Sequence, residues 1–205
     1  MGTKYEIAQL RSDAVKRLSY EYPSSLKEFD ESYIMPWKKI TFEKGITFSV
    51  ANLAQEIGLT SILPAVFYRI CASNDFIEEV LDGERGEIGQ QLTLSSDWQR
   101  ICVLARERLL EMQHNQTFRW AADGPSYQCK RRDKCDIESM KVFRQIFRNK
   151  PSCIALDPWK TKYEKGFCSL CVARFKEIHD VGRLNIWNQL PSVFGLPGWD
   201  ELSKD

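Results

Sequence analysis

The sequence predicts an all-α fold, an irregular multi-helix bundle whose C-terminal portion carries most of the cysteines. Apolar residues recur at three- and four-residue steps through most of the chain, which is the spacing of amphipathic helices. No stretch alternates apolar and polar residues for long enough to predict more than an incidental strand. No segment repeats at a fixed period, so the pattern does not indicate a solenoid.

Four helices are predicted in the first third of the chain, each with one apolar face. Ser24 or Ser25 is placed to cap the second, and Gly58 stands where the third needs a left-handed C-terminal cap. Pro64 is tolerated because it falls in the first turn of the fourth. The expected ranges are residues 4–18, 26–33, 50–57 and 61–71.

The middle of the chain predicts an exposed turn followed by the clearest helix. Glycine and charged residues crowd the turn between Asp82 and Gly89. Ser95 and Ser96 then cap a helix that we expect to run to about Gln116. Its buried stripe is expected to be Trp98, Ile101, Cys102, Ala105, Leu109 and Met112.

A break at residues 123–126 (Asp-Gly-Pro-Ser) predicts a boundary between two regions. We expect a helical region at 1–122 and a cysteine-containing helical region at 123–205 packed on it. The second region predicts two helices, the last running from near Ser169 to Leu190, with tail aromatics packing back onto the bundle. The apolar face of the earlier helix is expected to be Ile137, Met140, Phe143 and Phe147.

Composition restricts the class of protein. The 205 residues are enough for one large or two small domains, and 43% hydrophobic residues are too many for disorder. Lys plus Arg number 29 and Asp plus Glu 28, so bulk charge favours neither nucleic acid nor an anionic membrane. Apolar runs are far too short for a spanning helix, and no apolar signal segment opens the chain. We therefore expect a soluble intracellular protein, cytoplasmic or nuclear, with no membrane partner.

Two close-set cysteine pairs are the main candidate site. Cys168 and Cys171 have the C-x2-C spacing of zinc knuckles, while Cys129 and Cys135 have a wider C-x5-C spacing. Each pair comes just before a segment with helical periodicity, where main-chain N–H groups favour thiolate. The two pairs together predict a structural zinc site with four thiolate ligands that fastens the C-terminal half. Disulfides are a weaker interpretation, since the count of seven is odd.

The residues from Lys130 to Lys134 carry a local excess of three positive charges between the first two cysteines. These charges would offset the net −2 of a zinc ion bound by four thiolates. Two alternatives stay open at this point. The same loop could contact nucleic acid phosphates, although no DNA-binding helix is recognisable beside it. A solvated turn is the commoner fate of such residues.

The other cysteines and histidines have less specific interpretations. Cys71 and Cys102 lie on apolar helix faces and are expected to be small buried hydrophobes. Cys153 and His179 are spare candidate ligands, since His179 would share a helix face with Cys168. Cys168 with His179 could instead form the thiolate and base of a thiol enzyme, although no nucleophile signature surrounds either residue.

Three segments carry a resemblance to a known family: YEIAQLRSDAVKRLSYEYPSSLKEFD at residues 5–30, LAQEIGLTSILPAVFYRIC at 53–71, and FCSLCVARFKEIHDVGRLNIWNQLPSVFGLPGWDEL at 167–202. The first resembles the helices that end the BTB/POZ domain and lead onward in a group of fungal BTB/POZ-domain proteins. The second resembles the helical pair that follows in that group, and the third resembles its cysteine-containing C-terminal segment. The resemblance covers under half of the chain, in the expected order. It implies an all-helical, non-enzymatic protein-interaction region, with Cys168 and Cys171 matching the family's paired cysteines and Cys129 and Cys135 its upstream ones. The strands and dimer-forming helices of a BTB domain have no counterpart here, which puts cullin-adaptor activity in doubt. We expect a protein that binds a protein partner, in an adaptor or regulatory role.

Overall fold

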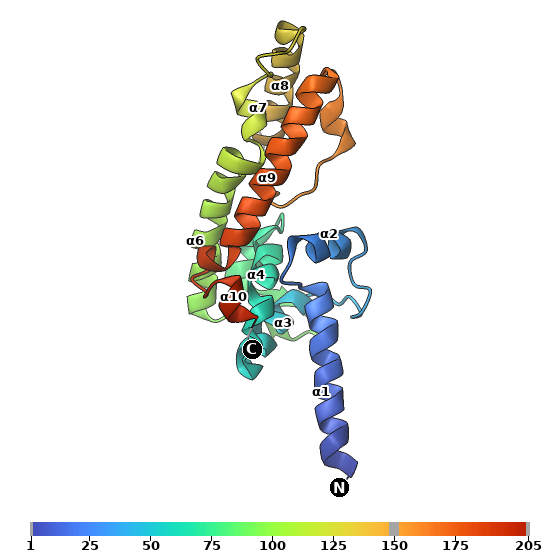
Figure 1. Cartoon of the computed structure of the whole chain (residues 1–205). Helices are drawn as coiled ribbons and strands as arrows, with labels where there is room; N and C mark the ends of the chain where they lie inside the picture. Colours follow the sequence, from blue (N-terminus) through green and yellow to red (C-terminus); the bar gives the residue numbers. More distant parts are fainter. Residues whose placement is uncertain (1, 148–151, 204–205) are drawn as a thin grey trace. The chain divides into compact units, whose positions relative to one another are not determined.

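The chain folds almost entirely into helices, as predicted (Figure 1). The computed structural model describes residues 2–147 and 152–203. A two-stranded antiparallel ladder, β1 (Glu84–Arg85) with β2 (Gln91–Leu92), is the sheet found among these residues. The ladder occupies the predicted exposed turn, so the all-α fold class holds. Within the described part of the chain, each helix is too short or too polar to cross a lipid bilayer.

The helices follow one another along the chain in this order. The N-terminal elements are α1 (Gly2–Glu21), α2 (Leu26–Ile34), α3 (Ile46–Ile57), η1 (Thr60–Ile62), α4 (Leu63–Cys71) and α5 (Phe76–Asp82). After the ladder come α6 (Ser96–Met112), the π-helical turn η2 (Gln113–Thr117), α7 (Arg119–Asp123) and α8 (Arg132–Phe147). The last elements are the 3-10 turn η3 (Thr161–Glu164), α9 (Ser169–Val193) and α10 (Trp199–Leu202).

Residue contacts divide the chain into two compact units. The first unit combines Met1–Cys71, Asp75–Val103 and Leu190–Asp205, and the second combines Ala72–Asn74 and Leu104–Gln189. Helices α6 and α9 each contribute residues to both units. Residue 123, where the sequence pattern placed a boundary, lies inside the second unit, because Gly124 only turns the chain between α7 and α8.

The first unit has its core around α4. The Phe67 ring is fully buried and lies 4.5 Å from Trp98 and 5.4 Å from Phe194, between ring centroids. This contact confirms that an aromatic residue of the tail packs back onto the helices. The apolar face predicted for α1 is buried only near its C-terminal end, since Ile7 and Leu10 are 67% and 68% exposed.

The second unit is built on an aromatic cluster between α7, α8 and α9. Trp120 and Phe175 stack with centroids 5.0 Å apart, and Phe118 lies edge-on to Tyr163 at 5.9 Å. Such pairs add stability beyond the apolar area that they bury. The buried members of this cluster are Phe118, Trp120, Ala121, Cys135, Val142, Tyr163, Cys171 and Phe175. Two of the predicted zinc ligands therefore belong to the core of this unit.

The orientation of α8 differs from the prediction. Ile137 and Met140 are 55% and 49% exposed, whereas Cys135, Ser139 and Val142 are buried. The Ser139 hydroxyl donates to the main-chain carbonyl of Ala121 at 3.0 Å, which holds this face of α8 against α7. The predicted helix is present, and Phe143 and Phe147 pack against the aromatic cluster as predicted. Its first half is rotated, so that Cys135 and Ser139 are buried in place of Ile137 and Met140.

Candidate metal centre

The four predicted ligands lie at two junctions between a loop and a helix. Cys129 lies in the turn before α8, where its N–H donates to the Ser126 carbonyl at 2.9 Å, and Cys135 lies in the first turns of α8. Cys168 directly precedes α9, and Cys171 lies in its first turn. Each pair therefore has one member in a loop and one on a helix.

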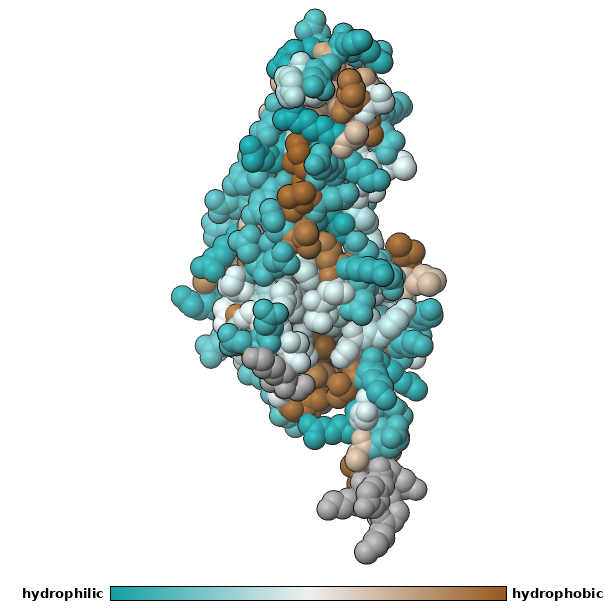
Figure 2. Space-filling model, viewed as in Figure 1, coloured by the Kyte–Doolittle hydropathy of each residue, from teal (hydrophilic) through white to brown (hydrophobic). Residues whose placement is uncertain are grey.

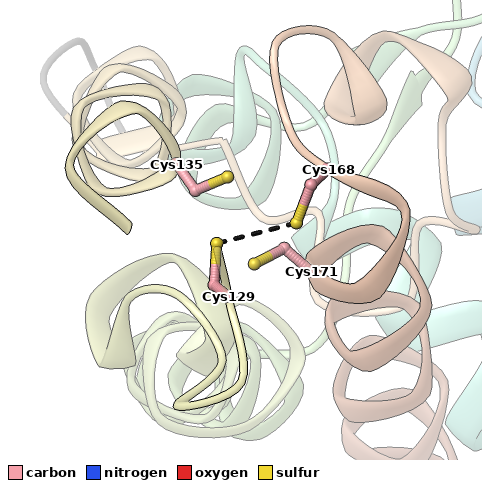
Figure 3. A group of neighbouring side chains, drawn as sticks. All are labelled: Cys129, Cys135, Cys168 and Cys171. Carbon is pink, nitrogen blue, oxygen red and sulfur yellow. Dashed lines mark hydrogen bonds between the residues drawn. The ribbon is translucent and has the colours of Figure 1, made fainter. Parts of the chain in front are cut away.

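The structure brings the four sulfur atoms together in one group (Figure 3). All four Sγ atoms lie within 4.8 Å of one another, and those of Cys129 and Cys168 are 3.6 Å apart. A tetrahedral zinc ion with Zn–S bonds of about 2.3 Å requires sulfurs about 3.8 Å apart. The Cys129–Cys168 distance matches that requirement, and the upper limit of 4.8 Å for the other pairs exceeds it by about 1 Å. The Cys129–Cys168 distance is also much longer than the ~2 Å of a disulfide bond. These four cysteines could hold a metal ion.

Main-chain N–H groups surround the sulfurs. The N–H of Arg131 donates to Cys129 at 3.4 Å, and the N–H of Cys171 donates to Cys168. Across the cluster, Cys135 accepts from the N–H of Cys168, and Cys171 accepts from the N–H of Ser126. Each sulfur thus has one main-chain donor. Donors of this kind stabilise thiolates, so the backbone suits four charged sulfurs better than four neutral thiols.

The pKa values of the thiols follow from these contacts and from burial. The N–H of Cys171 lowers the pKa of Cys168 to about 7. Burial raises the pKa of Cys171 to about 12 and also raises the pKa of Cys135. Without a cation the cluster favours one thiolate, because a second would be buried beside the first. A bound divalent cation would favour all four thiolates, since a coordinating thiol loses its proton.

The basic residues between Cys129 and Cys135 lie in the loop and first helical turn that carry two of the sulfurs. Lys130, Arg131, Arg132 and Lys134 are exposed, and the Arg131 guanidinium donates to the Gly166 carbonyl at 3.4 Å. With Asp133 they leave an excess of three positive charges near a group of thiols that would carry a net −2 with zinc. Their position fits the charge balance expected of a metal centre.

The two spare candidate ligands lie outside the cluster. His179 is fully buried, and its Nε2 lies 2.9 Å from the Asp157 carbonyl oxygen. Eleven helical residues separate it from Cys168, a rise of about 16 Å. His179 is therefore too far away to ligate the same ion or to act as base for Cys168. Cys153 is buried elsewhere in the unit, where desolvation raises its pKa to about 11.

Sequence reasoning missed the contribution of Ser126. Its main-chain N–H serves Cys171, which lies 45 residues further along the chain (171 − 126 = 45). A main-chain donor has no side-chain signature, so no residue pattern could have revealed it. The turn at Gly124, where φ is 73°, brings this segment back along α8.

Comparison with known proteins leaves the family open. No protein-family model, no curated protein and no solved structure matches this chain. The resemblance to the region after a fungal BTB/POZ domain therefore stays a prediction.

Proposed function

We propose that this chain is a non-enzymatic protein-interaction module whose second unit is closed by a structural zinc ion held by Cys129, Cys135, Cys168 and Cys171. The observation that carries the proposal is the convergence of four sulfurs, each with a main-chain N–H donor, within 4.8 Å of one another. Four protein ligands leave no open position on zinc for water or substrate. The ion would contribute to folding rather than to catalysis.

Zinc would act by joining two segments that are distant in the sequence. The turn before α8 and the start of α9 meet at the sulfurs, and Phe175 follows one helical turn after Cys171. A metal bound there would fix the register of α9 against the aromatic cluster. Apparent zinc binding energies are about 10–16 kcal/mol in small domains that fold only with metal. The second unit also has an apolar core, so we expect metal removal to loosen the unit without unfolding the whole chain.

Metal analysis of the purified full chain tests the zinc assignment. We expect about one zinc per chain, and loss of that zinc in Cys171→Ser. The matched control is Cys153→Ser, which places the same substitution at a buried cysteine of the same unit outside the cluster. The control should keep its zinc. A metal-free wild type, or equal zinc in both variants, would refute the site.

Limited proteolysis of the chelated protein tests the structural role. We expect new cleavage from about Tyr127 onward, while α6 stays protected, because local opening follows the loss of the contacts that closed it. Tyr127 is already 81% exposed, so a protease needs only local unfolding there. An unchanged cleavage pattern and unfolding temperature after complete metal removal would contradict a structural ion.

A binding role is supported by apolar side chains that the second unit leaves in solvent and by the fungal BTB/POZ resemblance. Val181 and Leu184 on α9 are 52% and 49% exposed. Figure 2 shows apolar side chains among hydrophilic ones on the viewed face. Exposed apolar residues favour partner binding when they gather on one surface. The free cysteines suit the reducing cytoplasm or nucleus, where we place this function.

Capture of partner proteins from a cell extract tests the binding role. We expect specific proteins to bind the full chain and to be lost with the pair Val181→Asp and Leu184→Asp. The control is the pair Ile137→Asp and Met140→Asp, which changes equally exposed residues on α8. It should retain the partners. Binding that is equal in both variants would exclude α9 as the contact surface.

A further inference from the structure

A second candidate site lies in the first unit, where the C-terminal half of α1 meets the loop that follows α2 (Figure 1). A hollow of about 500 Å³ is found there. Its lining residues are Asp13, Lys16, Arg17, Tyr20, Lys38 and Lys39. The hollow shares no residue with the metal centre, and its volume falls within the range of about 300–1,000 Å³ that is usual for small-molecule sites.

The loop that brings two of these lysines to α1 is held by a buried carboxylate. Glu21, fully buried at the end of α1, accepts the main-chain N–H groups of Trp37 at 3.0 Å and Lys39 at 2.6 Å. Trp37 adopts a left-handed backbone conformation with φ at 63°. This conformation is unfavourable for a bulky residue such as tryptophan. The Trp37 ring packs 5.2 Å from that of Phe42. The backbone under the lysines is therefore fixed at a conformational cost.

The side chains of the loop lysines gather over one aromatic ring. The ammonium groups of Lys38 and Lys39 lie 6.0 Å and 5.6 Å from the centroid of Tyr20. With Lys16 and Arg17 they give four cations around a hollow that contains one carboxylate, Asp13. The excess is three positive charges in a chain whose net charge is +1.

The protein's own carboxylates neutralise little of this positive charge. Asp13 reaches Lys16 at 3.8 Å, in a pair whose two side chains are 72% and 50% exposed. Within the described residues, no carboxylate lies in ion-pair range of Arg17, Lys38 or Lys39. The C-terminal end of α1 offers only about half a negative charge. Clustered like charges repel one another, so the arrangement favours an anion from solution.

We propose that this hollow binds a ligand with two or more clustered phosphate groups. One phosphate group carries about −1.5 to −2 at neutral pH, so two groups are needed to balance the excess of three positive charges. The acidic side chains of Glu28 and Glu31 line a neighbouring hollow that shares Lys16 and Tyr20, which confines the anion to the basic side. A soluble polyphosphate and a phosphoinositide headgroup present the same chemistry to these residues.

Calorimetric titration of the full chain with sodium tripolyphosphate tests the proposal at about 150 mM salt, where exposed charges further apart than about 8 Å are screened. We expect saturable binding of one ligand per chain that weakens as salt rises. The pair Lys38→Gln and Lys39→Gln should lower the affinity by about tenfold or more, since charge-assisted hydrogen bonds are lost. Both side chains are exposed, and the loop is held by main-chain groups, so the variant should keep its fold.

The matched control removes two exposed lysine charges of the same unit that do not line the hollow, with Lys27→Gln and Lys44→Gln. It should leave the affinity unchanged. Sedimentation with phosphatidylcholine vesicles that contain phosphatidylinositol bisphosphate distinguishes a lipid headgroup from a soluble polyphosphate. Binding to the vesicles assigns a lipid headgroup as the ligand. Binding to tripolyphosphate alone assigns a soluble ligand. Absence of saturable binding to either probe, or an equal loss in the control variant, would overturn the proposal. The zinc measurements are unaffected by this outcome, because the two sites share no residue.

Discussion

Acid should destabilise this protein through His179, whose imidazole is buried without a counter-charge. The side chain has no exposed surface, and its ring lies 5.1 Å from Phe118 and 5.4 Å from Trp159, between centroids. Burial lowers the pKa of His179 to about 4, and the positive charges of Arg183 and Lys160 act in the same direction. The hydrogen bond to the Asp157 carbonyl opposes these effects only in part.

The sign and size of the effect follow from linkage. An unfolded histidine has a pKa of about 6.5. Between pH 6.5 and pH 4, His179 is therefore protonated in the unfolded chain but neutral in the folded chain. Stability is therefore complete above this window and falls as the pH falls through it. Lowering the pKa from 6.5 to about 4 corresponds to about 3 kcal/mol of stability, of which about 2 kcal/mol is lost between pH 7 and pH 5.

Urea unfolding at pH 7, 6 and 5 measures this effect when wild type is compared with His179→Gln. The glutamine can still donate a hydrogen bond to the Asp157 carbonyl, but it does not titrate. From pH 7 to pH 5 the unfolding free energy of wild type should therefore fall by about 2 kcal/mol more than that of the variant. If the four cysteines hold a metal ion, acid would release it from both proteins, so that contribution cancels in the difference. Parallel pH profiles would refute the reasoning, since they would mean that His179 titrates alike in the folded and unfolded chains.

Two further predictions concern the π-helical turn η2. Gly182→Ala should destabilise the protein by about 2 kcal/mol, because a Cβ atom there would lie 2.5 Å from the main-chain carbonyl of Gln116, and backbone cannot move aside cheaply. Thermal and urea unfolding should show no comparable loss for Gly198→Ala, where a Cβ meets open space. Thr117→Val should cost about 1–3 kcal/mol in urea unfolding, because its buried hydroxyl donates to the Ala155 carbonyl at 2.6 Å, and the variant leaves that oxygen without its donor. A loss below about 0.5 kcal/mol in either Gly182→Ala or Thr117→Val would show that the turn relaxes around the change.

Helix positions and caps were predicted because their signals lie within a few residues. Ser25 accepts the Glu28 N–H at the start of α2, and Gly58 ends α3 with φ at 73°. The end of α9 was placed three residues early (193 − 190 = 3), since Pro191 was expected to stop a helix that continues to Val193. A proline removes one main-chain donor and crowds the carbonyl four residues earlier, and here the helix ends two residues after it.

The four cysteines that meet at the candidate site were singled out from the sequence, but their surroundings were not. Paired thiols at short spacing indicate a metal centre from residue types alone. The wide spacing between Cys129 and Cys135 becomes intelligible in the structure, where a loop precedes the helix that carries the second thiol. Ser126 and Gly124 could not be assigned a role, because their contribution depends on the path of the main chain.

By itself, the amino-acid sequence determined the helical class, the helix caps and the thiols suited to one ion, because periodicity, capping and ligand chemistry act over short stretches of chain. The tertiary structure alone decided which faces are buried and which distant groups meet. It turned Ile137 and Met140 to solvent, and it set Lys38 and Lys39 beside α1 through the carboxylate of Glu21. Burial depends on the neighbours that a residue acquires on folding, and segments far apart in the sequence supply those neighbours.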